Sequence, residues 1–237
     1  MILALIIAAA TATAAPSPTV ADASPLREVV YRVSFTRHER LSEESYGGGA
    51  DPRPVTQGAD QTDEGTVTVD VMAVSADTLG VRLRETWKER PRPATFFGNV
   101  APDGAVHFGD QPISEASSIL LQVFGTKWMH DEPLDPGAKW DVKYVNREAS
   151  FLTDYEVIGT NPDADTVTVR ETQTVDVQSV HGLNAFVTGT IQYKAALLVP
   201  VGIKLERRSS RGDADNSDVE TMVINIDRVS DTLDPAP

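Results

Sequence analysis

Hydrophobic positions recur every second residue near the start of the chain. Val29, Tyr31, Val33 and Phe35 are each separated by one residue, and most of the intervening positions are polar. Successive side chains of a β-strand point to opposite faces of a sheet, so this spacing places the four residues on one face. We therefore predict a strand that begins near Glu28 and buries this set.

Similar patterns recur along most of the chain, separated by short turn-rich connections. Asn161-Pro162-Asp163 is such a connection, because Pro presets φ and Asn and Asp favour turns. Segments joined by connections this short pair as antiparallel neighbours. The further strands that we predict cover residues 66–75, 79–89, 94–100, 105–108, 140–144, 151–159, 165–177, 186–198, 203–211 and 218–229.

Residues 113–124 break the period of two. Their apolar positions are spaced three and four apart, which is typical of one face of an α-helix, and Gly125 follows as a stop signal. Many strands and one helix predict a mainly β fold: a large curved antiparallel sheet or open β-barrel with one covering α-helix. We expect a single β-rich domain over residues 28–231.

Residues 42–65 interrupt the strands with a polar segment that contains Gly47-Gly48-Gly49, Pro52 and Pro54. Loops longer than about 15 residues are uncommon in compact domains and are usually functional or disordered. We predict a long disordered loop here.

The N-terminus has the pattern of a secretory signal peptide. An apolar run is followed by small residues, including Ala10, Ala12 and Ala14, although no Lys or Arg precedes the run. We predict a signal peptide over residues 1–15, a flexible spacer over residues 16–27, and a periplasmic or secreted location. The run is too short to span a bilayer, which needs about 20 apolar residues. No transmembrane segment is expected after the signal is removed.

Composition narrows the possible chemistry. The chain has 237 residues, 41% hydrophobic, which is enough to build a core. Its net charge of -14 argues against nucleic-acid partners, because phosphate binding needs clustered Lys and Arg. The absence of Cys excludes disulfides, thiol catalysis and Cys-ligated zinc.

Motifs for catalysis or metal binding are also missing. None of the four His residues lies within four positions of another, and no Gly-x-Ser-x-Gly elbow is present. The acidic run at residues 213–220 lacks the glycine and the final Glu of a calcium loop and is interpreted as a charged hairpin tip. We therefore predict no catalytic residue, no metal site and no cofactor.

Aromatic residues near the predicted helix suggest a ligand site. Trp128 and Trp140 flank the loop after the helix, and they could line a cavity under it with three helical residues, Leu120, Leu121 and Phe124. The alternative is that these side chains simply cap the core of the sheet. The first interpretation predicts an apolar small molecule or a lipid as ligand.

Two resemblances bear on function. The Asp135-Pro136-Gly137-x-x-Trp140 turn and the segment Gly189-Thr190-Ile191-Gln192-Tyr193 resemble uncharacterised secreted bacterial β-rich domains. The order of a signal, many strands and one helix is similar to that of periplasmic lipoprotein-localisation carriers. That resemblance implies an unclosed barrel that shelters acyl chains. The leading hypothesis is an exported soluble binding module for an apolar ligand; the alternative is a structural or protein-interaction component of the cell envelope.

Overall fold

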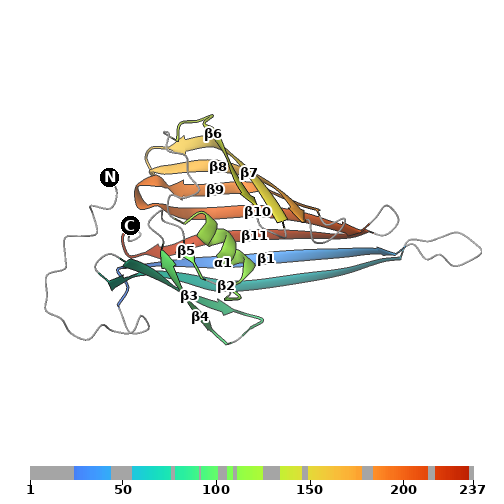
Figure 1. The fold of residues 1–237 in the computed structure, drawn as a ribbon, viewed down its shortest axis with the longest axis horizontal. Helices are drawn as coiled ribbons and strands as arrows, with labels where there is room; N and C mark the ends of the chain where they lie inside the picture. Colours follow the sequence, from blue (N-terminus) through green and yellow to red (C-terminus); the bar gives the residue numbers. More distant parts are fainter. Residues whose placement is uncertain are drawn as a thin grey trace, which may run out of the picture.

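Antiparallel strands make up most of the protein, as the computed structural model in Figure 1 shows. The structure describes residues 24–43, 55–75, 78–90, 92–100, 106–108, 111–124, 134–145, 149–177, 184–212 and 217–234. The strands are β1 (Arg27–Glu43), β2 (Val55–Ser75), β3 (Thr78–Trp87), β4 (Ala94–Val100), β5 (Val106–His107), β6 (Lys139–Val145), β7 (Ala149–Asn161), β8 (Thr166–Val177), β9 (Asn184–Lys194), β10 (Val199–Gly212) and β11 (Ser217–Asp231). The helices are α1 (Glu115–Gln122) and the short 3-10 helix η2 (Ala195–Leu197).

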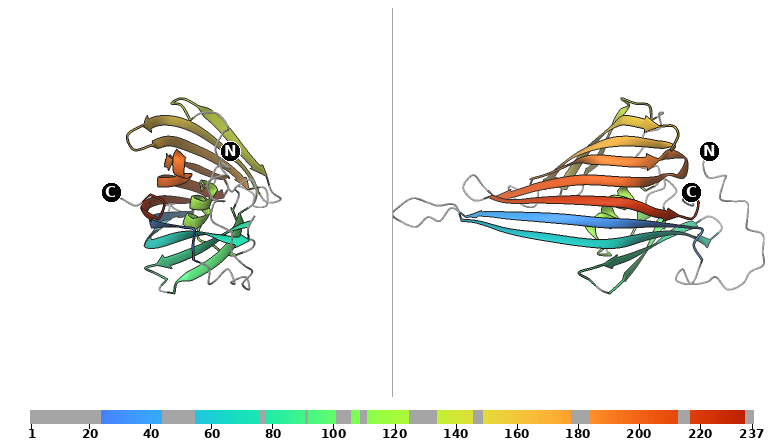
Figure 2. Two further views of the ribbon diagram at one scale, coloured as in Figure 1. Left: turned by 90° about the vertical axis from the view of Figure 1, so that its left-hand side faces the viewer. Right: turned by 180° about the vertical axis from the view of Figure 1, so that it is seen from behind.

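All the strands belong to one sheet of 11, in the order β5-β4-β3-β2-β1-β11-β10-β9-β8-β7-β6. The first and last strands of the chain therefore pair at its centre, with Val29 opposite Asp231. Strands β5 and β6 form the two ends of this order, so the sheet stays open. Figure 2 shows that it curves strongly and that α1 lies in the hollow. The predicted fold, a curved open sheet with one covering α-helix, is confirmed.

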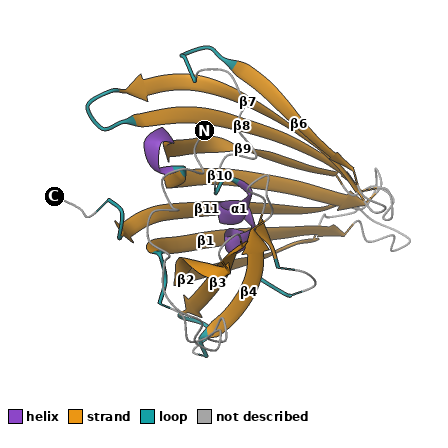
Figure 3. Ribbon diagram, turned by 60° about the vertical axis from the view of Figure 1, so that its left-hand side comes forward, coloured by secondary structure: helices purple, strands orange, loops and turns teal. Residues whose placement is uncertain are grey.

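The core lies between the concave face of the sheet and α1, an arrangement that is also visible in Figure 3. Val29, Tyr31 and Val33 of β1 are fully buried, as the alternation predicts. The buried Tyr31 hydroxyl donates a hydrogen bond to the Pro200 carbonyl oxygen at 3.2 Å. Since a buried hydroxyl without a partner is costly, this bond makes the tyrosine compatible with the centre of the core.

The predicted loop over residues 42–65 is wrong for most of its length. Strand β1 continues to Glu43 and β2 starts at Val55, and the two pair residue by residue along residues 55–65. Backbone hydrogen bonds hold this extension. Five of the seven residues 58 and 60–65 are exposed, so this part of the strand shows no apolar alternation. Residues 44–54 lie outside the described residues, as do the predicted signal peptide and the spacer up to residue 23.

Between β9 and β10 the connection also differs from the prediction. Strand β9 ends at Lys194, η2 follows, and Leu198 adopts a left-handed conformation with φ of 56°. Pro200 and Gly202 fall between the predicted strands 186–198 and 203–211, but in the structure they lie within β10 at a β-bulge. A bulge adds a residue to one strand and bends it, which helps the sheet to curve.

Gly189 marks a place where the sheet is packed too closely for any side chain. A Cβ atom there would lie 2.0 Å from the Lys204 carbonyl oxygen and 2.5 Å from Leu205 Cδ2. Leu205, the cross-strand neighbour of Gly189, therefore covers the glycine backbone directly. No described helix is long and apolar enough to cross a membrane.

Candidate functional site

The N-terminus of α1 is fixed to the sheet by side chains. Ser114 caps the helix, and its Oγ accepts a hydrogen bond from the Ser117 backbone N–H at 3.2 Å. Glu85 of β3, which is 3% exposed, accepts from the Ser114 backbone N–H at 3.0 Å and from Trp87 Nε1 at 3.1 Å. One buried carboxylate thus joins the helix to an indole on the concave face.

A cleft of about 250 Å³ opens beside this joint, between α1 and the concave face. Phe35 and Trp87 form part of its wall and meet edge to face, with ring centroids 5.9 Å apart. The cleft is slightly smaller than typical small-molecule pockets, which occupy about 300 to 1,000 Å³. Its apolar lining is Phe35, Trp87, Ala116, Met222 and Ile224, and its polar lining is Arg37, Arg90, Ser114, Glu115 and Arg207.

Two of the arginines of the cleft are tied to glutamates. Arg207 donates to Glu115 of α1 and, at 2.6 Å, to Glu220 of β11, while Arg37 donates to Glu220 through Nε at 2.7 Å. Burial would raise the pKa of Glu220, but hydrogen bonds from Arg37 and Arg207 outweigh it and lower that pKa. Burial prevails at Glu115 and raises its pKa, although Arg207 opposes it. These ion pairs link the helix to the sheet at one side of the cleft.

Arg90 differs from these two residues. Its guanidinium lies 5.4 Å from the centroid of the Trp87 ring, at a distance typical of a cation–π contact, and its side chain is exposed. Within the described part of the chain, no carboxylate pairs with it. Arg207 also has one unused donor, because its Nε is buried and has no hydrogen-bond partner among the described residues.

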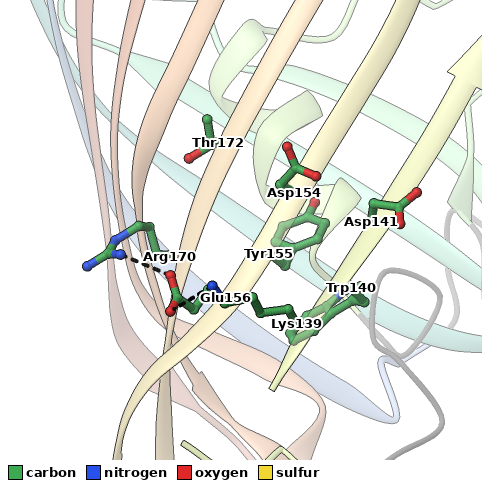
Figure 4. A pocket seen from close by; sticks show the side chains of 8 residues that line it. All are labelled: Lys139, Trp140, Asp141, Asp154, Tyr155, Glu156, Arg170 and Thr172. Atoms are coloured by element: carbon green, nitrogen blue, oxygen red, sulfur yellow. Dashed lines mark hydrogen bonds and ion pairs between the residues drawn. The ribbon is translucent and has the colours of Figure 1, made fainter. Parts of the chain in front are cut away.

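A second depression, of about 370 Å³, lies over β6, β7 and β8 (Figure 4). Glu156 lines it and pairs with Arg170 at 3.0 Å and with Lys139 at 3.5 Å. Asp141 and Asp154 face each other across β6 and β7 in the same depression. Exposed pairs of this kind contribute little binding energy. Trp140, which was proposed from the sequence, lines this depression together with Tyr155, and its other six lining residues are polar or charged.

Four of the five residues proposed from the sequence lie in or against the core. Leu120 is 0%, Phe124 9% and Trp140 8% exposed, and Leu121 is partly buried and packs against the core cluster. Trp140 stacks on Tyr155 with ring centroids 5.3 Å apart. None of these residues lines the cleft beside α1. Trp128 lies outside the described residues.

The residues that do form the cleft were not singled out from the sequence, but a signal for them exists. Arg37 continues the every-second-residue series of Tyr31, Val33 and Phe35, and Glu85 falls between Leu83 and Trp87 in the corresponding series of β3. A charged residue in phase with buried ones must point into the hollow. Such residues mark the polar part of the concave face.

Glu171 is a third charged residue in such a series, following Val167 and Val169 of β8. It lies directly opposite Tyr155 on one neighbouring strand and Gly189 on the other, and it is 4% exposed. No hydrogen bond or ion pair to it is found in the described part of the structure. Burial raises the pKa of its carboxyl from 4.5 to about 7.

Neither metal chemistry nor relatives supply a further indication of function. The described residues contain no group of three or more His, Asp or Glu placed to hold a metal ion. No protein-family model matches the sequence, and a search of curated proteins gave no significant match.

Proposed function

We propose that this protein is an exported binding module that holds the apolar part of a small amphiphilic ligand in the cleft beside α1. The observation that carries the proposal is the composition of the cleft: five apolar side chains line it, and charged groups are gathered on the same cleft. Ligand sites commonly combine an apolar wall with a few polar groups that orient the ligand. The N-terminal apolar run supports export to the periplasm or the medium.

The size of the cleft limits the ligand. Core side chains fill most of the hollow, among them Leu120, Phe124 and Trp140, and the remaining space of about 250 Å³ fits a small molecule or one segment of a larger one. A carrier that encloses several complete acyl chains needs a much larger cavity. The ligand that we propose is therefore smaller than the lipid expected from the resemblance to lipoprotein-localisation carriers.

Titration with octanol, an uncharged amphiphile, tests the proposal. Trp87 forms part of the cleft, so binding should change tryptophan fluorescence in a saturable manner. The variant Met222→Trp places a larger side chain in the cleft and should abolish the change. Val229→Trp is the matched control, because Val229 is 51% exposed and lies outside the cleft lining. Circular dichroism verifies that both variants fold, and an unsaturable response in the wild type would refute the proposal.

The open sheet supports one alternative, a structural or protein-interaction component of the envelope. Among the described strands, β6 pairs only with β7, so its other edge carries no described strand and could accept a further one. On the neighbouring strands, Leu152 and Phe186 are 42% and 47% exposed and lie in one row, each opposite Thr174. Chemical cross-linking in the native host followed by mass spectrometry tests this alternative, which predicts cross-links from Lys139 and Lys143 of β6 to a second protein.

A further inference from the structure

The unpaired donors of the cleft indicate the head group of its ligand, an inference that rests on the proposed function. Of the three arginines that line the cleft, Arg37 and Arg207 are held by glutamates and Arg90 has no carboxylate partner in the described structure. Arg207 Nε is a second donor without an acceptor there. A ligand group that only accepts hydrogen bonds would complement the exposed guanidinium of Arg90.

The surroundings of Arg90 favour an anion that enters beside an apolar chain. The guanidinium lies over Trp87, whose ring forms part of the cleft wall, so a head group at Arg90 leaves the chain next to the apolar lining. The strong hydrogen bonds that guanidinium groups form with carboxylates are short and charge-assisted. We propose that the ligand is an apolar chain ending in a carboxylate, and that Arg90 is its principal polar contact.

The net charge of the protein makes this local contact necessary for selectivity. At -14, the protein as a whole repels anions and attracts cations. Without a specific cation at the cleft, a positively charged amphiphile would be preferred over a negatively charged one. Ligands with the same apolar chain and different head groups therefore test the contact: tighter binding of the anionic ligand indicates a specific cation at the cleft.

The test compares octanoate, octanol and octylamine, which share one chain length, by isothermal titration calorimetry with the full-length mature protein. Octanoate should bind about threefold to tenfold more tightly than octanol, as expected for a partly exposed charged hydrogen bond. Arg90→Gln should remove this preference, so that octanoate and octanol bind to the variant with equal affinity. The control is Arg92→Gln, since Arg92 is also exposed but does not line the cleft.

The outcomes separate this inference from the function on which it rests. If octanol binds but octanoate has no advantage, or if Arg90→Gln leaves the advantage intact, the carboxylate inference is refuted and the apolar cleft stands. Tighter binding of octylamine than of octanoate would also refute the carboxylate inference. If none of the three amphiphiles binds to the wild type, the proposed function fails as well.

Discussion

The buried carboxyl of Glu171 makes stability depend on pH in a direction opposite to that of most carboxylates. Its pKa is about 7 in the folded protein and 4.5 in an ordinary environment, so between these values the folded state holds a proton that the unfolded state has lost. The free energy of unfolding therefore falls as the pH rises from about 4.5 to 7. At about 1.4 kcal/mol per pH unit, the total loss is about 3 kcal/mol.

Glu171→Gln isolates this contribution, because an amide has a similar shape and does not ionise. The variant should differ little from the wild type near pH 4.5 and should be more stable by up to about 3 kcal/mol at pH 8, where the wild type buries a charge. Urea unfolding, followed by tryptophan fluorescence at several pH values, measures the difference. Glu206→Gln is the control, since Glu206 is an exposed glutamate on β10.

The pH dependence of the difference is the decisive result. If the free energies of unfolding of the wild type and Glu171→Gln differ by a constant amount between pH 4.5 and 8.5, then the pKa of Glu171 is the same in the folded and unfolded states. Burial would then not raise the pKa of the Glu171 carboxyl, and the prediction would be refuted.

Three further predictions concern contacts that hold the fold together. Gly189→Ala should destabilise the protein by about 2 to 3 kcal/mol in urea unfolding. Its control is Gly159→Ala, where no atom lies within 4 Å of the added Cβ, and this variant should change the free energy of unfolding by less than about 0.5 kcal/mol. Equal effects of the two substitutions would contradict the close packing at Gly189. Glu85→Ala leaves two N–H donors without their acceptor and should cost about 2 to 4 kcal/mol, while a loss below about 0.5 kcal/mol would show that this joint is unimportant. Asp231→Asn should cost about 3 kcal/mol at pH 7. Burial would raise the pKa of Asp231, but hydrogen bonds, chiefly from Arg27, lower it, so the wild-type advantage should shrink as the pH falls below about 4. An advantage of the same size at pH 7 and pH 2 would argue against this ion pair.

Much of the fold could be predicted from the sequence because the concave face is apolar. Wherever one face of a strand is buried, side chains alternate with a period of two, and the segments at Val29, Val81 and Val169 follow that rule. The prediction failed at residues 55–65, where five of the seven residues 58 and 60–65 are exposed. The pairing of β2 with β1 there depends on backbone hydrogen bonds. Such bonds do not require apolar residues at every second position, so the sequence shows no strand pattern.

The candidate site was less accessible to sequence reasoning. The sequence predicted a ligand site at the aromatic and helical residues near α1, yet Leu120 and Trp140 are core residues. Large side chains pack in the concave side of a curved sheet and form its core. The cleft instead combines side chains from strands far apart in the chain, such as Phe35, Trp87 and Met222. Only the sheet order brings these three together. The sequence does indicate the polar part of the concave face, because Arg37 and Glu85 are charged residues in phase with buried neighbours.

The pairing of β1 with β11 determines when the sheet can be completed. Arg27 and Asp231 are 204 positions apart, yet their side chains meet at the centre of the sheet. During synthesis, β1 finds β2 early, but its other edge lacks a partner until the last strand leaves the ribosome. Contacts of such large sequence separation also slow folding. The central pair of strands in a nascent chain of this topology thus stays incomplete until β11 has been synthesised.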